Sequence, residues 1–219
     1  MSSYIYMKLL ESQPDRYDRG LAWLSLGRSE RIKEKLTEEN VKEGSRVLEI
    51  GVGTGTMAIL AARRGASVLG FDISSAMLSI AADKIEREGL GDRVELKEMG
   101  VSGMDRLPAE RFDLVSSTLV FSELSADEQS YALSHSYRAL KPGGSLALAC
   151  EARPRSAWNR LLHTLIRIPL LVITFIFTQT TTHAVDGLEE RVEAAGFKLE
   201  KAERSGLDNF LYLVARKEK

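Results

Sequence analysis

The sequence is poor in the residues that bind metals and form disulfides. Cys150 is the single cysteine among 219 residues, which excludes an internal disulfide, and the three histidines are too scattered to form a zinc site. We therefore expect no bound metal. A lone thiol suits a reducing compartment, and the cytoplasm is the predicted location.

The chain has no excess of charge of either sign. Thirty Lys and Arg balance thirty-one Asp and Glu, which leaves a formal net charge of -1. Because binding along nucleic acid depends on a positive surface, this balance argues against nucleic acid as a principal partner.

Long apolar runs are missing as well. Charged residues, beginning with Lys8 and Glu11, interrupt the first part of the chain before the apolar stretch of a secretory signal can form. The most apolar segment, residues 168–177, is well short of the roughly 20 residues that a membrane-spanning helix needs. We expect no transmembrane segment, although Trp158 and Arg167 beside this run leave peripheral contact with a lipid surface open.

Strand-like and helix-like patterns alternate from residue 46 onward, which is typical of parallel strands joined by crossover helices. The expected strands are residues 46–50, 67–72, 94–98, 112–117 and 145–150, the last after a turn at 141–144. The expected helices are residues 55–64, 74–88, 127–140 and 188–195, and residues 197–204 and 210–216 form a terminal hairpin. The predicted fold class is α/β: a Rossmann-like, seven-stranded, mostly parallel sheet with helices on both faces and an antiparallel C-terminal hairpin.

One domain accounts for the length of the chain. Its 219 residues, 44% of them hydrophobic, can bury one sizeable core, and about 150 residues per domain is the usual expectation. We predict a single domain over residues 1–219, with an N-terminal cap at 1–40 and a lid-like insertion at 155–185. Pro169 would begin or kink a helix in the insertion, for which plain core packing and a partner-facing patch are the alternatives.

A glycine-rich turn follows the first expected strand. Residues 47–55 read Val-Leu-Glu-Ile-Gly-Val-Gly-Thr-Gly, so a ligand can approach bare backbone where the next helix opens. A dinucleotide-binding turn would carry a further glycine at position 56, which is Thr56 here. The pattern therefore favours a nucleoside without phosphates, with a purely structural turn as the alternative.

Asp72 ends the second expected strand, about twenty residues after the turn, where a carboxylate can accept hydrogen bonds from both hydroxyls of a ribose. Such bonds contribute about 1.5 to 3 kcal/mol, enough to change affinity about tenfold or more. A helix-capping aspartate is the alternative. Because the turn and the carboxylate follow adjacent strands in the right order, the two together favour a nucleoside site.

With these residues, the sequence from about residue 46 to residue 217 resembles the class I S-adenosylmethionine-dependent methyltransferases. Residues 112–115, followed by Thr118-Leu119, and the run Leu140-Lys141-Pro142-Gly143-Gly144 are similar to further motifs of this family. The resemblance implies S-adenosylmethionine as the cofactor. It also implies binding roles: Glu49 near the sulfonium, Gly51, Gly53, Thr54 and Thr118 along the methionine part, and Asp72, Ile73 and Met77 around the ribose and adenine.

Two departures from the family pattern concern the adenine and the acceptor. The third strand leads into Met99-Gly100-Val101, where the family often has an acidic residue near the adenine amino group, so backbone groups of Gly100 and Val101 are expected to serve instead. Ser122-Glu123 stands where many relatives have two histidines, so the acceptor cannot be inferred from common relatives.

Residues 4–11, 14–18 and 178–182 resemble a narrower group of methyltransferases that are associated with corrinoid proteins. That resemblance implies a corrinoid protein as a candidate partner. It also adds Tyr17, in a leader that would cover the site, to the expected cofactor-binding residues.

Methyl transfer from a sulfonium is an in-line displacement with an activated leaving group, so the protein mainly aligns the reactants and excludes water. An oxygen or nitrogen acceptor that carries a proton needs a base, for which Glu123, His183 and Glu151 are the candidates, whereas a thiolate or reduced cobalt needs none. Solvated or structural roles are the alternative for all three residues. We expect an enzyme that methylates a small molecule or a protein-bound acceptor; the alternative is a non-catalytic S-adenosylmethionine-binding module that docks a partner protein.

Overall fold

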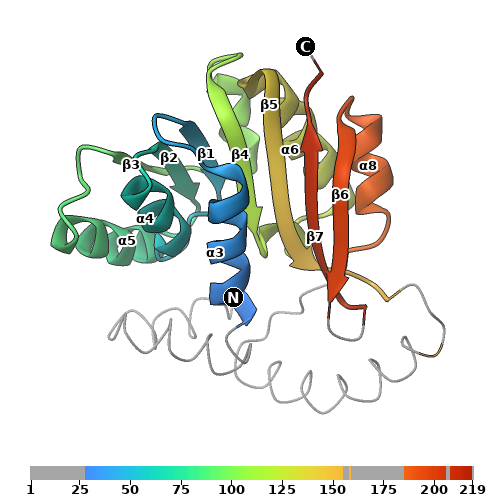
Figure 1. Ribbon diagram of the computed structural model, residues 1–219, viewed down its shortest axis with the longest axis horizontal. Helices are drawn as coiled ribbons and strands as arrows, with labels where there is room; N and C mark the ends of the chain where they lie inside the picture. The colour runs from blue at the N-terminus through green and yellow to red at the C-terminus, as the bar shows by residue number, and fades with distance from the viewer. Residues whose placement is uncertain (1–27, 155–157, 159–184, 206–207, 219) are drawn as a thin grey trace.

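A computed structural model describes residues 28–154, 158, 185–205 and 208–218 (Figure 1). Most of the predicted cap and insertion, including Tyr17 and His183, lies outside the described residues. The arrangement of one domain over residues 1–219 with this cap and insertion therefore stays a prediction.

The centre of the molecule is a seven-stranded sheet with the order β3-β2-β1-β4-β5-β7-β6 (Figure 1). The parallel strands are β1 (Arg46–Ile50), β2 (Ser67–Asp72), β3 (Val94–Glu98), β4 (Phe112–Thr118) and β5 (Leu140–Glu151). The two last strands, β6 (Lys198–Ser205) and β7 (Phe210–Arg216), are antiparallel to each other, and β7 is also antiparallel to β5. The predicted fold class is confirmed.

Helices cover both faces of this sheet. They are α3 (Arg28–Asn40), α4 (Thr56–Arg63), α5 (Ser75–Arg87), α6 (Ala126–Ala139) and α8 (Leu188–Ala194), with the short 3₁₀ helices η1 (Val101–Arg106) and η2 (Val120–Ser122). No helix in the described ranges is long and apolar enough to cross a membrane.

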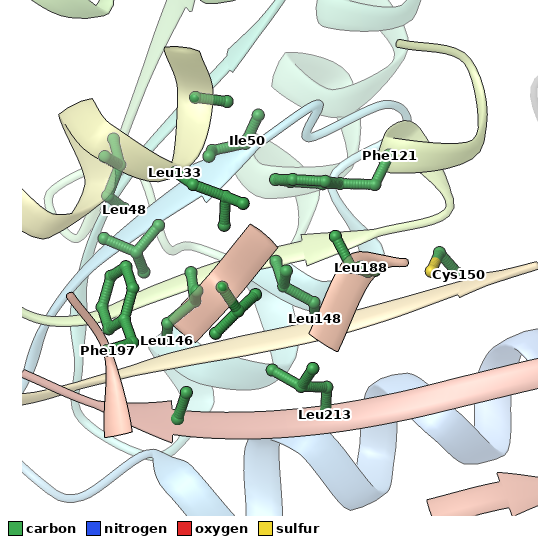
Figure 2. Close-up of a cluster of buried hydrophobic side chains, with 14 of the residues drawn as sticks. Leu48, Ile50, Phe121, Leu133, Leu146, Leu148, Cys150, Leu188, Phe197 and Leu213 are labelled. Atoms are coloured by element: carbon green, nitrogen blue, oxygen red, sulfur yellow. The ribbon is translucent and has the colours of Figure 1, made fainter. Parts of the chain in front are cut away.

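Alternation along the strands divides the apolar side chains between two cores. Val47 belongs to the cluster shared with α3 and α4, whereas Leu48 and Ile50 belong to the cluster shared with α6 and α8. Figure 2 shows the second cluster, in which Leu133 of α6 and Leu188 of α8 lie among the labelled strand residues. Because both faces of β1 are covered, the four residues after Arg46 are all buried, and Glu49 is one of them.

The expected start of the fifth strand is wrong. Its Pro-Gly-Gly run predicted a turn at 141–144, but β5 begins at Leu140 and its register against β4 shifts between Phe112 and Leu114. The Gly143 N–H donates to the Lys217 carbonyl, and the Lys217 N–H donates to Gly144, each at 2.9 Å. Pairing with the distant C-terminal segment therefore outweighs the local turn preference.

The sheet order reverses between β1 and β4. β1 leads through α4 to β2 on one side, whereas the chain returns after β3 to place β4 on the other side of β1. In open α/β sheets, ligands bind at the carboxyl ends of the strands beside such a reversal. The glycine turn and Asp72 both lie at this edge.

Candidate cofactor and active site

A cavity of about 680 Å³ opens at the carboxyl ends of β1, β2 and β3 and beside η2. Two other hollows, of about 560 and 590 Å³, are lined by none of the predicted site residues. The wall of the first cavity brings together six residues predicted from the sequence, namely Gly51, Asp72, Ile73, Gly100, Val101 and Glu123.

Gly51 and Gly53 of the turn are glycines for different structural reasons. A Cβ on Gly51 would lie 2.0 Å from Cγ2 of Val120, so the segment after β4 can approach only bare backbone there. Gly53 also has a positive φ of 52°, but no atom lies within 4 Å of the position that its Cβ would take. Gly51 is thus required for packing, whereas Gly53 leaves open space beside the backbone.

The Asp72 carboxylate joins the turn to the following helix. Its Oδ2 accepts a hydrogen bond from the Gly53 N–H at 2.9 Å, and its Oδ1 accepts one from the Ser74 N–H at 3.0 Å. Each carboxylate oxygen has a further lone pair, and the side chain is half-buried in the cavity wall. The two ribose hydroxyls of a nucleoside can therefore donate to Asp72 without breaking its backbone contacts.

Glu49 is a buried acid with an unsatisfied oxygen. The residue is 3% exposed, and its Oε2 has no hydrogen-bond partner among the described residues. Burial raises the pKa of Glu49 to about 8, opposed by the positive charge of Lys33 and assisted by the negative charge of Asp72. A cationic ligand group near Glu49 would offset the cost of its ionisation.

The adenine end predicted for the site has an apolar wall. Ile73 is 76% exposed although it is large and apolar, and a Cβ on Gly100 would lie 3.2 Å from its Cγ2. The Met99 N–H donates to the Asp72 carbonyl at 2.9 Å, which fixes the start of the following loop. A flat apolar ring placed here would cover Ile73 without any rearrangement of the sheet.

The sequence did not predict the contribution of α6 to this wall. Tyr131 lines the cavity, and its hydroxyl donates to the Ser102 carbonyl at 3.2 Å. Nη2 of Arg138 lies 2.7 to 3.0 Å from three carbonyl oxygens near the end of η1, those of Met104, Asp105 and Leu107. No local signal could reveal these contacts, since they join residues about thirty positions apart.

Five predicted residues of the described part of the chain lie outside the cavity wall, namely Glu49, Gly53, Thr54, Met77 and Thr118. Met77 is buried, and its N–H donates to Ser74 Oγ, which caps α5. Thr54 is also buried, and its Oγ1 faces Thr56 and Lys84 at 3.4 and 3.5 Å. Thr118 is half-buried, and its Oγ1 is a buried atom without a hydrogen-bond partner in the described ranges.

Glu123 is the candidate base that the structure describes. It follows η2 and is exposed at the lip of the cavity, where partial desolvation, and secondarily the charge of Asp72, raise its pKa. Leu119, between β4 and η2, has a left-handed φ of 73°. This conformation is uncommon for a non-glycine residue, and it redirects the chain after β4. A carboxyl group with a raised pKa is better suited to proton transfer near neutral pH than an ordinary one.

The residues present fit S-adenosylmethionine. Glu49 offers an unsatisfied oxygen for a positive charge, Thr118 a second unpartnered oxygen, and Asp72 free lone pairs for a ribose. Exposed Ile73 offers an apolar surface for a base. Fold and site together define an α/β protein with a nucleoside site. The buried acid Glu49 suits this site to a nucleoside that carries a positive charge.

Known proteins match part of the chain. Residues 47–144 match the family described as the methyltransferase domain. The chain is 36% identical over 132 residues to the ubiquinone/menaquinone biosynthesis C-methyltransferase of Xanthomonas oryzae pv. oryzae, a match that covers 58% of this chain and 51% of that protein. It is 30% identical over 131 residues to the erythromycin 3''-O-methyltransferase of Saccharopolyspora erythraea, covering 59% of this chain and 42% of that protein. The chain thus spans about half the length of these curated relatives.

A solved structure shares the fold. The phosphoethanolamine N-methyltransferase 2 of Haemonchus contortus, in complex with phosphomonomethylethanolamine and S-adenosylhomocysteine, matches with a TM-score of 0.67 and 20% identity over 86% of this chain and 53% of that chain. The match over residues 47–144 agrees with the predicted methyltransferase, and the solved structure agrees with the predicted fold. None of these three relatives names a corrinoid protein.

The open space beside Gly53 predicts that a side chain at this position weakens ligand binding, and a control variant separates this loss from backbone strain. Gly53→Ala is expected to weaken S-adenosylmethionine binding about tenfold or more, because the added methyl group occupies space beside the turn. Gly89→Ala is the matched control, since Gly89 has a similar φ of 65° and an equally open Cβ position away from the cavity. Calorimetric titration measures the affinity and urea unfolding the stability. Equal affinities for the two variants would contradict a ligand at Gly53.

Buried Glu49 predicts a pH-dependent stability. Since its pKa is raised, the folded chain retains a proton that the unfolded chain loses, and the free energy of unfolding falls as pH rises from about 5 to about 8. Glu49→Gln should remove this pH dependence. The free energy of unfolding of the variant, relative to that of the wild type, should therefore rise with pH by at most about 1.4 kcal/mol per pH unit. Urea unfolding of both proteins without ligand measures the difference. Parallel pH profiles would show that Glu49 is not desolvated.

Proposed function

We propose that the protein transfers the methyl group of S-adenosylmethionine to a small-molecule acceptor. The observation that carries the proposal is one cavity in which Asp72, the bare turn at Gly51 and an exposed carboxyl group, Glu123, line a common wall. A binding module needs the nucleoside contacts alone. The additional carboxyl group with a raised pKa favours catalysis.

When bound, S-adenosylmethionine supplies an activated methyl group on a sulfonium leaving group. The residues of the chain bind and orient it: Asp72 holds the ribose, Glu49 balances the positive charge, and Ile73 packs against the base. Buried Glu49 also makes the methionine end selective for a cation, because its ionisation is costly without one. The product, S-adenosylhomocysteine, lacks the sulfonium charge and so loses part of this attraction, which favours its release.

Glu123 is proposed to take the proton of an oxygen or nitrogen acceptor as the methyl group moves. The relatives named above are a C-methyltransferase, an O-methyltransferase and an N-methyltransferase, so they do not decide the acceptor atom. His183 and the corrinoid partner remain sequence predictions, since the residues on which they rest lie outside the described part of the chain. No observation favours the docking module over the enzyme.

The proposal predicts a specific loss when Asp72 is replaced. Asp72→Ala should weaken S-adenosylmethionine binding about tenfold or more, and it should also lower stability because two backbone N–H groups lose their acceptor. Asp113→Ala is the matched control: Asp113 accepts from the Arg46 N–H at 2.8 Å and pairs with Lys141, but lies outside the cavity wall. It should lose stability while keeping affinity.

Methyl-labelled S-adenosylmethionine, incubated with the protein and fractionated host extract, tests the transfer itself. The expected result is label in a small-molecule fraction with the wild-type and Asp113→Ala proteins and much less with Asp72→Ala. Tight binding without any Asp72-dependent labelling would favour the binding module, and label confined to a protein fraction would contradict the small-molecule acceptor.

Glu123 predicts a pH dependence of turnover for an oxygen or nitrogen acceptor. Activity requires the ionised base, so kcat/KM should rise with pH through the raised pKa of Glu123 and then level off. Glu123→Gln should lose this rise and at least about a hundredfold in rate. Glu128→Gln is the control, because Glu128 lines the same cavity but hydrogen bonds within the α6 capping box lower its pKa. An unchanged profile in Glu123→Gln would remove the base assignment.

A further inference from the structure

A second cavity, of about 590 Å³, lies at the opposite ends of the strands from the cofactor site. It opens beside the first residues of β1, β2 and β3, which lie side by side in the sheet (Figure 1). Two acidic residues line it, Asp92 and Glu95, against five basic ones, namely Arg46, Arg93, Lys97, Arg106 and Arg111. The whole chain has a formal net charge of -1, so the positive charge of this cavity is a local feature.

The sheet fixes the strand side of the cavity. Arg46 pairs with Ser67 across β1 and β2, and the Val68 N–H donates to the Arg93 carbonyl at 2.8 Å, so Arg46, Ser67 and Arg93 lie in one row. Two strand spacings place the backbones of Arg46 and Arg93 roughly 10 Å apart, and residues in register on parallel strands share a face. The long side chains of both arginines can therefore reach one small ligand near Ser67.

The loop between η1 and β4 forms a second wall and carries Arg106 and Arg111. Its backbone is tied to the end of α6, because the Glu110 N–H donates to the Arg138 carbonyl and the Arg111 N–H donates to the Ala139 carbonyl, each at 2.9 Å. The Arg138 side chain in turn donates to three carbonyl oxygens just before the loop and within it. Both arginines are thus carried by a backbone that is held in place.

Three of the five basic side chains have no partner among the described residues. Nη1 of Arg93 donates to the Gly65 carbonyl at 3.0 Å, and Nζ of Lys97 lies 3.0 Å from Oε1 of Glu95. No hydrogen bond or ion pair within the described ranges involves the guanidinium groups of the other three, Arg46, Arg106 and Arg111. Their charges remain available to a ligand.

Acidic residues next to the loop do not neutralise these charges. Oε1 of Glu110 lies 3.6 Å from Nζ of Lys217, and Oδ1 of Asp113 lies 2.6 Å from Nζ of Lys141. The excess of three positive charges in the wall is best balanced by a ligand with at least two negative charges. A phosphorylated ligand supplies them, and a guanidinium group can bind two phosphate oxygens at once. A single carboxylate supplies only one.

The size and the apolar part of the cavity suit a small molecule. Ligand sites in proteins commonly have about 300 to 1,000 Å³ and combine apolar walls with a few polar groups. The apolar part here comes from the strands and the loop and consists of Val68, Leu69, Val94, Leu107, Pro108 and Phe112.

We propose that this cavity binds a small phosphorylated molecule with at least two negative charges, whose phosphate is held by Arg46, Arg106 and Arg111. The site is separate from the proposed methyl transfer, because no residue lines both this cavity and the cofactor cavity.

Calorimetric titration with pyrophosphate tests the site, at constant ionic strength because salt screens exposed charges. We expect the wild type to bind one pyrophosphate per chain. The dissociation constant should rise at least about tenfold in the double variant Arg46→Gln/Arg111→Gln, which loses hydrogen bonds to a charged group. Arg106→Gln should weaken binding as well. All three side chains are exposed, so urea unfolding should show little change in stability.

Arg64→Gln/Arg87→Gln is the matched control, since it removes two exposed arginines that lie outside the cavity wall. It should keep the affinity of the wild type for pyrophosphate. Equal weakening by the two double variants would show that only the overall charge matters and would overturn the proposal. Acetate binding as tight as pyrophosphate binding, or a wild type that binds no pyrophosphate at millimolar concentration, would overturn it too.

Vesicles that contain phosphatidylserine distinguish a lipid headgroup from a free ligand. We expect Arg46→Gln/Arg111→Gln to sediment with such vesicles to the same extent as the wild type. Sedimentation that this double variant abolishes would assign the basic cavity to a lipid surface and overturn the small-molecule ligand.

Discussion

The contact between the Asp72 carboxylate and the Gly53 N–H holds together the parts of the site that the sequence keeps apart. The turn follows β1 and the carboxylate ends β2, and the second oxygen of Asp72 accepts from Ser74 at the start of α5. One side chain therefore fixes the turn, the strand end and the helix start relative to one another. Because Asp72 lines the cavity and its oxygens keep further lone pairs, the same group can recognise a ribose without giving up its structural role.

This arrangement places the negative charge of Asp72 near a second acid, Glu49. The charge of Asp72 adds to the desolvation of Glu49, so the ligand-free site favours a protonated Glu49. A ligand with a positive charge reverses that preference. Burial and charge alone therefore make the surroundings of Glu49 better suited to a cationic group than to a neutral one.

The sequence predicted those features that local chemistry determines. The strand ends, the glycine turn and Asp72 could be located because strand periodicity and backbone freedom require particular residue types at those positions. Thr54 and Met77 were assigned by resemblance, and the structure places both side chains in packing around the helix starts rather than in the cavity wall. Tyr131 and Arg138 were missed, because each matters only through contacts between distant segments. The early start of β5 was missed for the same reason, since it depends on Lys217.

The two sides of the cavity differ in how strongly the fold constrains them. The nucleoside side is built from the ends of adjacent parallel strands, whose hydrogen bonds fix every backbone position within narrow limits. The acceptor side begins at the left-handed Leu119 and continues through η2 to Glu123. Hydrogen bonds tie this segment to β5: the Leu119 N–H donates to the Ala149 carbonyl, and the Glu151 N–H donates to Ser122 Oγ. Exposed side chains such as Glu123 can change here without disturbing the pairing of the strands, which is a physical route by which one fold can serve different acceptors.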